Sequence, residues 1–408
     1  MALSSQLAPA LIEDSSLADW TVIGSGGFGQ IFKARHQKWC CDVAIKLLHH
    51  DDGTSKSLLR EIDMMRQGSS PYVIQVLGVF RGRLPSYGPT TQLGLVMEFM
   101  ERGSLASLQE TLHETPPWPL VFRLAHQVSL GINFLHSLSP SVLHLDLKPS
   151  NVLLDTSLKA KLTDFGLARF YHSVSRISKK DNEEDGGTIS YMPPEAFNLS
   201  YTPTRASDIY SYGILLWAMV TGKQPYEHAQ TNIVRFRIPQ GDRPSLDEIT
   251  SQAAGIAGLT GLMNLMKRCW EAKPKQRPSS QECTTETEEL YKLHKHAIVD
   301  AVHEVLKKLD EKEEQAMTEQ VHVTQPSVFS LLQRQFSSPE ALSRHAQPVH
   351  SPAVHIHLSN VTGFQQGNNN TMYIFDPTER KRHPTAPSRV SVPPPHSGNR
   401  RNQTGGVG

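Results

Sequence analysis

The 408-residue sequence predicts an α+β domain followed by a long polar tail. Between about residues 17 and 295, apolar side chains recur with helical or strand periods between turn signals, and this part contains all five tryptophans. Short alternating segments near its start indicate strands, whereas the apolar run 209–220 indicates a buried helix. From about residue 311 the composition becomes polar, which is typical of segments that cannot form a core.

The overall composition excludes several classes of protein. Lys and Arg number 41 and Asp and Glu number 40, so no net field attracts nucleic acid or an anionic membrane. The run 209–220 is too short to cross a bilayer, so we expect no direct membrane insertion. Residues 1–16 lack a basic start and soon become acidic, unlike a signal peptide. We therefore expect a cytosolic protein that binds no nucleic acid.

Cysteine spacing and one basic cluster bear on where the protein works. Cys40 and Cys41 are adjacent, and none of the four cysteines forms a CxxC pair or a zinc-type pattern with histidine. Free thiols in a reducing cytosol are therefore expected. The basic cluster at residues 379–383 fits a solvated run of tail charge, which we favour, or a patch for nuclear shuttling.

Four segments are expected after the domain. Residues 296–317 are predicted to extend it as an amphipathic helix, because apolar residues recur there at steps of three and four. The members of this pattern are Leu290, Leu293, Ile298, Val302, Val305 and Leu309. Such a helix forms either a dimer seam or a last helix packed on the domain, and its few heptads favour packing. Residues 318–352 are predicted to be a disordered linker, 353–376 an assembly motif, and 377–408 a disordered basic and Pro-rich tail.

A glycine-rich loop at residues 24–29 matches G-x-G-x-x-G, a pattern found in more than one kind of nucleotide site. A dinucleotide-binding loop opens a helix, but residues 30–36 alternate like a strand. No P-loop sequence occurs in the chain. The loop is therefore predicted to be a flap between two strands, with backbone N–H groups that approach phosphates. The residues expected to line this part of the nucleotide site are Ile23, Gly24, Ser25, Gly26, Gly27, Phe28, Gly29, Gln30 and Ile31.

Lys46 closes the apolar strand 42–46, where an unpaired ammonium would be costly to bury. Glu61, in a helical segment at residues 57–65, offers a partner and would leave the ammonium to bind nucleotide phosphates. Taken alone, Glu61 would be interpreted as a surface glutamate of a helix. The ion pair is preferred because of the motifs that follow.

Two later motifs supply groups for phosphoryl transfer. In "HLDLKPSN", residues 144–151, Asp146 is placed to accept the proton of a substrate hydroxyl and Lys148 to neutralise the transferred group. Asn151, together with Asp164 of the "DFG" motif, offers hard oxygens to Mg²⁺. A lone DFG would mean little, but the ordered set of flap, lysine, loop and DFG is highly specific. The chain is thus expected to use ATP and Mg²⁺.

These motifs, in this order, resemble those of protein kinases over about residues 20–295. The resemblance implies a bilobal kinase fold with a β-rich N-lobe and a helical C-lobe. Lys148, followed by Pro and Ser, is similar to the loop of serine/threonine kinases. Met97 stands at the gatekeeper position, and Glu98 and Met100 belong to the hinge that would hydrogen-bond adenine.

The resemblance also implies two structural contacts and shows one departure. Glu195, in "GGTISYMPPE", is expected to pair with Arg277, and Asp208 matches the aspartate that anchors the catalytic loop. Leu145 stands where an arginine usually pairs with a phosphorylated residue of the activation loop. The enzyme either works without that switch or is a damaged kinase. We favour the first, because every chemical residue is present.

Three segments are similar to the receptor-interacting protein kinases: "ARHQKWCCDVAIK", "GTISYMPPE" and "PPWPLVFRLAHQVSLGINFLHSL". Members of this group differ after the kinase domain, where they carry a death domain, a caspase-recruitment domain or ankyrin repeats. The tail of this chain shows neither a compact helical bundle nor an ankyrin period. It therefore needs another explanation.

The tail contains a stretch similar to the homotypic amyloid motif of this group. The motif is expected to involve Phe364, Gln365, Gly367, Asn370 and Met372. The Gln, Gly, Asn and Met residues keep the motif spacing, whereas Phe364 and Gln366 stand where small aliphatic residues are usual. Residues 353–361 alternate like a strand, a Gly/Asn stretch provides bends, and residues 371–375 resemble a second strand. Stacked in register, such chains would form amide ladders. The alternative is an Asn-rich linker with chance apolar residues.

The resemblance implies a serine/threonine kinase that assembles through this motif and phosphorylates itself and a downstream pseudokinase effector in necroptosis and inflammatory signalling. Its expected partners are further copies of the chain, other kinases or adaptors with the same motif, and that effector. One alternative is a catalytically weak scaffold that acts by amyloid recruitment. Others are a kinase with an inert tail and a related receptor-interacting kinase of innate immunity.

Overall fold

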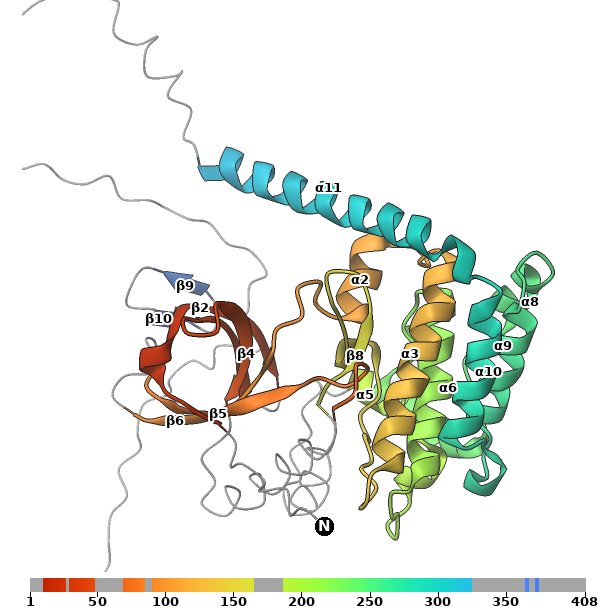
Figure 1. Cartoon of the computed structure of the whole chain (residues 1–408). Helices are drawn as coiled ribbons and strands as arrows, with labels where there is room; N and C mark the ends of the chain where they lie inside the picture. The colour runs from red at the N-terminus through yellow and green to blue at the C-terminus, as the bar shows by residue number, and fades with distance from the viewer. Residues whose placement is uncertain are drawn as a thin grey trace, which may run out of the picture. The chain divides into compact units, whose positions relative to one another are not determined.

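The computed structural model describes residues 10–26, 29–47, 69–84, 90–164, 186–324, 364–366 and 371–373. The chain divides into two compact units, residues 1–328 and 329–408, and each is described by itself. The first unit joins a β-sheet lobe to a helical lobe (Figure 1), which is the bilobal α+β arrangement that the sequence predicts. Within the described residues, no helix has both the length and the apolar character that crossing a bilayer requires.

The N-terminal lobe is a six-stranded sheet with strand order β1-β5-β6-β4-β3-β2. Its strands are β1 (Ala10–Ile12), β2 (Leu17–Gly26), β3 (Gly29–His36), β4 (Cys41–Leu47), β5 (Val76–Gly82) and β6 (Gln92–Glu98). Neighbouring strands are antiparallel except for β1 and β5. Phe32, Ile45, Phe80 and Val96 belong to an apolar core of this lobe, and Trp20 packs against it.

Strand β1 lies before residue 17, where the predicted domain begins. It pairs in parallel with β5, so that Ala10 lies opposite Gly78. Gly78 leaves room for this strand, because a Cβ there would lie 2.3 Å from the carbonyl oxygen of Ala10. A Cβ at Gly82 would come within 2.9 Å of the backbone nitrogen of Asp14, in the 3-10 turn η1 (Asp14–Ser16). Three residues are too few for an alternating pattern, so the sequence did not reveal β1.

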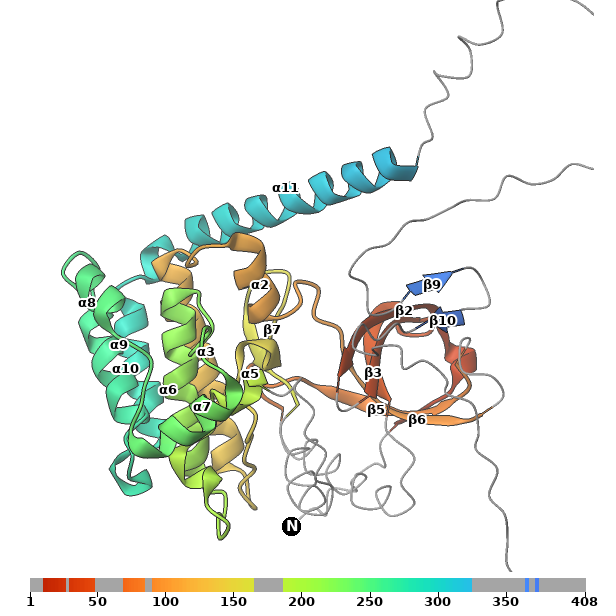
Figure 2. The same cartoon turned by 180° about the vertical axis from the view of Figure 1, so that it is seen from behind.

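The second lobe is helical and is built around α6 (Arg205–Thr221). Every residue from Ser207 to Thr221 is buried, which confirms the predicted buried helix at residues 209–220. α6 packs against α3 (Trp118–Ser137) and α9 (Leu259–Cys269), and α10 (Ser280–Lys292) packs against α3 (Figure 2). The other short elements are α2 (Leu105–Leu112), α5 (Gly186–Ile189), α7 (Thr231–Arg237), α8 (Asp247–Ala253), η2 (Pro149–Asn151), η4 (Pro194–Phe197), η5 (Ile238–Gln240), η6 (Pro274–Gln276) and η7 (Lys295–Ala297).

A two-stranded hairpin positions the predicted metal ligands. Strand β7 (Val152–Leu154) begins directly after Asn151, and β8 (Ala160–Leu162) ends shortly before Asp164. Val152 lies opposite Leu162, so both predicted ligands emerge at the same end of the hairpin. The N–H of Thr163 donates to the carbonyl oxygen of Asn151 at 3.1 Å and holds the two chain segments together.

Helix α11 (Ile298–Thr324) packs on the helical lobe rather than forming an exposed seam. Ala301, Val305 and Leu309 are buried, and the helix contacts α2 and α3. This is the packed last helix that the sequence favours over a dimer seam. Its apolar face covers the lobe in the way that amphipathic helices usually do.

The boundaries of this helix differ from those predicted. The apolar pattern that begins at Leu290 is broken by η7, because His294 stacks on Phe122 with ring centroids 4.3 Å apart and turns the chain after α10. The helix then continues to Thr324, past the predicted end at residue 317. The first residues of the predicted linker, 318–324, are therefore helical.

The second unit contains a short antiparallel hairpin of β9 (Phe364–Gln366) and β10 (Thr371–Tyr373). Gln365 lies opposite Met372. Part of the predicted strand 371–375 is thus present as β10, whereas β9 was not predicted as a strand. The predicted strand at residues 353–361 lies outside the described residues, as do Gly367 and Asn370.

Candidate active site

An ion pair joins the sheet lobe to the helical lobe. Lys46 lies on β4, and its Nζ is 2.7 Å from Oδ1 of Asp164. The Lys46 side chain is almost fully buried, whereas Asp164 keeps 17% of its side-chain surface exposed. A buried ammonium requires such a partner, because its desolvation would otherwise be costly. Glu61, the predicted partner, lies outside the described residues, so its role stays a prediction.

Asp146 forms a second charged group on the loop before η2. The Nζ of Lys148 lies 3.0 Å from Oδ2 of Asp146, and the Nδ2 of Asn151 donates to the same oxygen at 2.8 Å. Lys148 also donates to the Oγ1 of Thr188 at 2.8 Å. Since both side-chain contacts use Oδ2, the Oδ1 of Asp146 is the oxygen available to accept a proton. The structure therefore brings Asp146, Lys148 and Asn151 together, as the sequence predicts.

The oxygens of Asn151 and Asp164 suit a small hard cation. The Nδ2 of Asn151 also donates to the carbonyl oxygen of Asp146 at 2.8 Å, which leaves its Oδ1 as the possible ligand. Asp164 has a left-handed backbone (φ 60°), an uncommon conformation that is typical of functional sites. Within the described part of the chain, no group of three or more His, Cys, Asp or Glu could hold a metal alone. This donor set fits Mg²⁺, which protein sites usually bind with one or two side chains plus phosphates.

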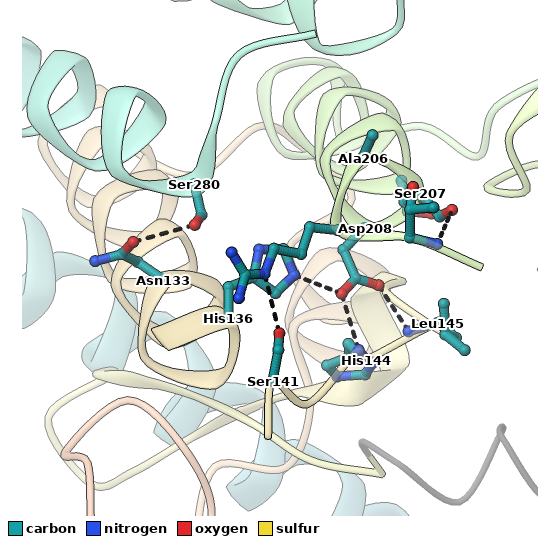
Figure 3. A network of polar contacts seen from close by, with 12 residues as sticks. Asn133, His136, Ser141, His144, Leu145, Ala206, Ser207, Asp208 and Ser280 are labelled. Carbon is teal, nitrogen blue, oxygen red and sulfur yellow. Dashed lines mark hydrogen bonds and ion pairs between the residues drawn. The ribbon is translucent and has the colours of Figure 1, made fainter. Parts of the chain in front are cut away.

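A buried carboxylate holds the catalytic loop (Figure 3). Asp208 accepts hydrogen bonds from the Nε2 of His136 at 2.8 Å and from the backbone N–H groups of His144 at 2.9 Å and Leu145 at 2.7 Å. Asp208 is fully buried at the start of α6. Burial lowers the pKa of His144, although the charge of Asp208 opposes this shift. The anchoring contact implied for Asp208 is therefore present.

Leu145 contributes its backbone to this network. Its φ of 64° is left-handed, an uncommon conformation for a residue with a branched side chain. The hydrogen bond from its N–H to Asp208 helps to hold that conformation. Its side chain is half-buried and carries no charge, so it supplies no cation to the activation segment. Residues 165–185 of that segment lie outside the described residues.

The second implied structural contact is a bidentate ion pair. The Nη1 and Nη2 atoms of Arg277 each donate to one oxygen of Glu195 at 2.7 Å. Arg277 also donates to the carbonyl oxygens of Ala206 and Glu271, and its guanidinium lies over the ring of Tyr210. The Arg277 side chain is fully buried, so these contacts replace the water that it loses. They connect η4, α6 and the segment before α10.

The predicted gatekeeper and hinge follow one another at the end of β6. Met97 is buried opposite Ala44 of β4, and Met100 is also buried. Glu98 is held by its side chain, because its carboxylate lies 2.7 Å from the Nζ of Lys161 on β8. The same carboxylate accepts the N–H of Gln75 at 2.7 Å. The backbone of this segment is thus fixed beside the helical lobe.

The glycine-rich loop lies between two strands, as predicted, and does not open a helix. In the β2–β3 hairpin, Gly24 lies opposite Ile31 and Gly26 opposite Gly29. Ile31 in turn lies opposite Lys46, which places the flap strands beside the buried ammonium. Ile23 is 45% exposed at the start of the loop. Gly27 and Phe28 lie outside the described residues, and the side chain of Ser25 is not described.

Two site contacts were missed by the sequence analysis. Lys148, predicted to be catalytic, donates a hydrogen bond to Thr188, and Lys161 donates one to Glu98 of the predicted hinge. Thr188 lies in "GTISYMPPE", which singled out the segment but not the contact. Lys161 sits on a three-residue strand whose pattern gave no signal. Both contacts join residues that are far apart in sequence.

Comparison with known proteins places this site in a family. The family model described as "Protein kinase domain" matches residues 18–287. Receptor-interacting serine/threonine-protein kinase 3 of Rattus norvegicus is 39% identical over 299 residues, which cover 72% of this chain and 60% of that protein. The Homo sapiens protein of the same name is 38% identical over 309 residues, or 74% of this chain and 58% of that protein. Receptor-interacting serine/threonine-protein kinase 4 of Mus musculus is 39% identical over 294 residues, or 70% of this chain and 35% of that protein.

The chain thus spans about 60% of the length of the first two of these relatives. The family match includes both lobes and every described residue of the charged site. The hairpin β9–β10 lies beyond it. The chain belongs to the protein kinase family, and its kinase domain is similar to those of receptor-interacting serine/threonine-protein kinases.

Proposed function

We propose that this protein is a serine/threonine kinase that transfers the γ-phosphoryl group of ATP to protein hydroxyls with Mg²⁺ as cofactor. The observation that carries the proposal is the grouping of charges around Asp146 and the Lys46–Asp164 ion pair. Lys148 is followed by Pro149 and Ser150, which supports serine and threonine as acceptors. The similar relatives are named as serine/threonine-protein kinases, which agrees with this specificity.

Each residue of the site has a distinct task in this mechanism. The Oδ1 of Asp146 orients the acceptor hydroxyl and takes its proton, while Lys148 neutralises the transferred phosphoryl group. Lys46 binds the phosphates of ATP, for which it exchanges its contact with Asp164. Asn151 and Asp164 would hold Mg²⁺, which when bound neutralises charge on the phosphates. Almost all of this catalysis is positioning and electrostatic stabilisation.

Transfer of label from γ-labelled ATP to the protein and to a serine peptide tests the kinase proposal. We expect the full chain to incorporate label, and Lys148→Ala to reduce incorporation by about a hundredfold. Lys159→Ala is the matched control, because Lys159 is exposed and its described contact is made by its backbone. A wild-type chain that binds Mg·ATP but transfers no label would replace this proposal with a scaffold function.

We also propose that the tail concentrates the kinase by amyloid assembly. The support is the motif similarity and the presence of two short strands, β9 and β10, at the motif positions. In-register stacking of many copies would pair every backbone group with the next chain and align Gln365 and Asn370 in amide ladders. Copies of this chain and other proteins with the same motif are the proposed partners. The resulting local concentration would promote phosphorylation between copies.

A peptide of residues 353–376 tests the assembly proposal. It should form fibrils with a strand spacing of about 4.7 Å. Replacing Gln365, Gly367 and Asn370 by alanine should prevent them, because two ladders are lost and a bend is stiffened. In cells, this triple change in the full chain should abolish clustering and leave intrinsic kinase activity intact. Alanine at Gly398, Asn399 and Gln403 is the matched control; a motif variant that still clusters would identify the stretch as an ordinary polar linker.

The proposed cellular role is phosphorylation of a pseudokinase effector in cytosolic necroptotic and inflammatory signalling. Its support is the similarity of the kinase domain to receptor-interacting kinases, together with the tail motif. Kinase and motif variants separate the two contributions. If both Asp164→Asn and the tail triple change block effector phosphorylation in cells, activity and assembly are both required. If the tail triple change blocks effector phosphorylation and Asp164→Asn does not, the result supports the scaffold alternative.

A further inference from the structure

A groove of about 500 Å³ lies on the helical lobe, between the end of α3, the start of α6 and the start of α10. Neither Asp146 nor Lys46 lines it, so it is separate from the active site. Arg205, Lys275 and Arg277 contribute cationic side chains to its walls, and Glu282 contributes a carboxylate. The side chains that define it come from three helices and the segment that precedes α10.

Two of these cations have no acidic partner among the residues that the structure describes. Within the described residues, neither Arg205 nor Lys275 lies in an ion pair, and the Nε of Arg205 donates only to the neutral Ser141 hydroxyl at 3.1 Å. Arg277 is neutralised by Glu195. The Oε2 of Glu282 accepts both the N–H and the hydroxyl of Ser279 at 2.7 Å, and the charge of this carboxylate offsets one of the two cations. The groove therefore keeps a surplus of positive charge.

The N-terminus of α10 adds hydrogen-bond donors. Ser279 caps this 13-residue helix, and its hydroxyl accepts the N–H of Glu282. The N–H groups of Ser280 and Gln281 have no acceptor among the described residues. The Ser280 hydroxyl donates to Asn133 at 3.1 Å. Free N–H groups at a helix start, with the positive end of the helix dipole, favour an anion.

A buried histidine in the groove wall supplies an independent observation. His136 is 3% exposed, and its Nε2 is committed to Asp208 at 2.8 Å. Its Nδ1 has no hydrogen-bond partner among the described residues, which is unfavourable for a buried polar atom. In Figure 3, His136 and the Asn133–Ser280 pair lie on one side of Asp208, with Leu145 on the other. The imidazole thus connects the groove to the carboxylate that holds the catalytic loop.

We propose that this groove binds a phosphomonoester, either as free phosphate or on a phosphorylated serine side chain. The oxygens of the anion would meet Arg205, Lys275 and the first N–H groups of α10. The Nδ1 of His136, which has no hydrogen-bond partner among the described residues, adds a polar atom to the wall that faces the anion. A tetrahedral dianion has three oxygens that accept hydrogen bonds from donors arranged in three dimensions, whereas the two oxygens of a carboxylate prefer donors near their plane.

Isothermal titration calorimetry of the full chain, with ADP filling the nucleotide site, tests this proposal. The probes are a phosphoserine peptide, inorganic phosphate and the unphosphorylated peptide. We expect the first two to bind and the third not to bind. The double variant Arg205→Gln, Lys275→Gln should weaken binding by about tenfold or more, because two charge-assisted hydrogen bonds are lost. Lys267→Gln, which removes an exposed lysine of α9 outside the groove, should leave binding unchanged.

The arms of the experiment also identify the source of the anion. Binding of the phosphopeptide more tightly than phosphate would assign the groove to a phosphorylated protein segment, and the reverse would assign it to free phosphate. Either result supports the proposal when the double variant binds the probe at least about tenfold more weakly than wild type does. Equal binding to wild type and double variant, or no binding of either phosphorylated probe to wild type, would overturn it. A far-UV circular dichroism spectrum like that of wild type shows that the double variant is folded.

Discussion

Asp164 and Asp208 are two carboxylates near the catalytic loop, and the structure uses them in opposite ways. Asp208 is fully buried, and three donors occupy its two oxygens. Asp164 is partly exposed and makes its described ion pair through one oxygen. A carboxylate whose acceptor capacity is filled by the protein stabilises the fold, whereas one that keeps an oxygen for a ligand can act in chemistry. This difference predicts which substitutions affect activity and which affect folding.

Asp164→Asn should have the largest effect on activity. The amide is nearly isosteric, but it removes the charge that pairs with Lys46 and that would hold Mg²⁺, so autophosphorylation should fall by about a hundredfold to a thousandfold. Lys46→Ala should abolish autophosphorylation in the same way. The melting temperature of Asp164→Asn should fall less than that of Asp208→Asn, since the Asp164 side chain is already partly hydrated and the amide oxygen can still accept a hydrogen bond from Lys46. Label transfer and differential scanning calorimetry measure the two effects, and a fall in melting temperature as large as that of Asp208→Asn would contradict the comparison.

Asp208→Asn should show the opposite pattern, with a loss of stability first. Its amide would place N–H groups against the donors of His144 or Leu145, leaving buried donors unsatisfied. Arg277→Gln tests the other buried charged contact of the helical lobe, because it breaks the ion pair between Arg277 and Glu195. Removing one partner of such a pair costs about 3–5 kcal/mol of unfolding free energy. Urea unfolding of both variants measures the effect, and values within about 1 kcal/mol of wild type would refute the structural role.

Leu145 predicts that dephosphorylation lowers kinase activity less than it does in a kinase with arginine at this position. Its backbone makes the contact with Asp208, but its side chain offers no cation to a phosphorylated residue. Phosphatase treatment should therefore lower kinase activity less than tenfold, which corresponds to less than about 1.4 kcal/mol of transition-state stabilisation. Leu145→Arg sharpens the test, since it should make activity depend more strongly on phosphorylation. A tenfold loss in the wild type would show that another basic residue has taken that role.

Buried histidines predict a loss of stability in acid. Burial lowers the pKa of His126, whose Nδ1 lies 3.2 Å from the Thr287 hydroxyl, and burial also lowers that of His144. The folded state therefore binds fewer protons than the unfolded state. The stabilisation is complete above the unfolded pKa of about 6.5 and is lost as pH falls through that value toward the lower folded pKa. The melting temperature should drop between about pH 7.5 and 5.5, and His126→Gln should reduce that drop, unlike His303→Gln at an exposed position.

The comparison of the two carboxylates also shows what the sequence could and could not reveal. Motif order was enough to predict the two lobes, the anchoring Asp208 and the grouping of Asp146 with Lys148 and Asn151, because these features depend on residue type at fixed spacing. The residues that contact these site residues were harder to predict. Thr188 and Lys161 reach the site through tertiary contacts, and the break at η7 depends on His294 stacking on a distant aromatic ring. Strand β1 was missed because it has only three residues and because the room for it is made by Gly78, far along the chain.

The smallest predicted effect concerns the contact of α11 with the hinge. Arg102, two residues after Met100, places Nη1 2.8 Å from Asp310 and 3.7 Å from Glu313 of α11. The acidic side chains are more than half exposed, so solvent screens the interaction, and we expect it to contribute about 0.2–1 kcal/mol. If the contact helps to position the hinge, Arg102→Gln should raise the KM for ATP by up to about fivefold and leave kcat unchanged.

A matched variant distinguishes hinge positioning from simple docking of the helix. Lys308 on the same helix lies 2.7 Å from Glu114, at a contact outside the hinge. Lys308→Gln should therefore loosen α11 in the same manner as Arg102→Gln and lower the melting temperature by a similar small amount, while the KM for ATP stays at the wild-type value. Equal changes in KM for both variants would mean that helix docking as a whole, rather than Arg102, shapes the hinge. An unchanged KM for Arg102→Gln would restrict α11 to a structural role.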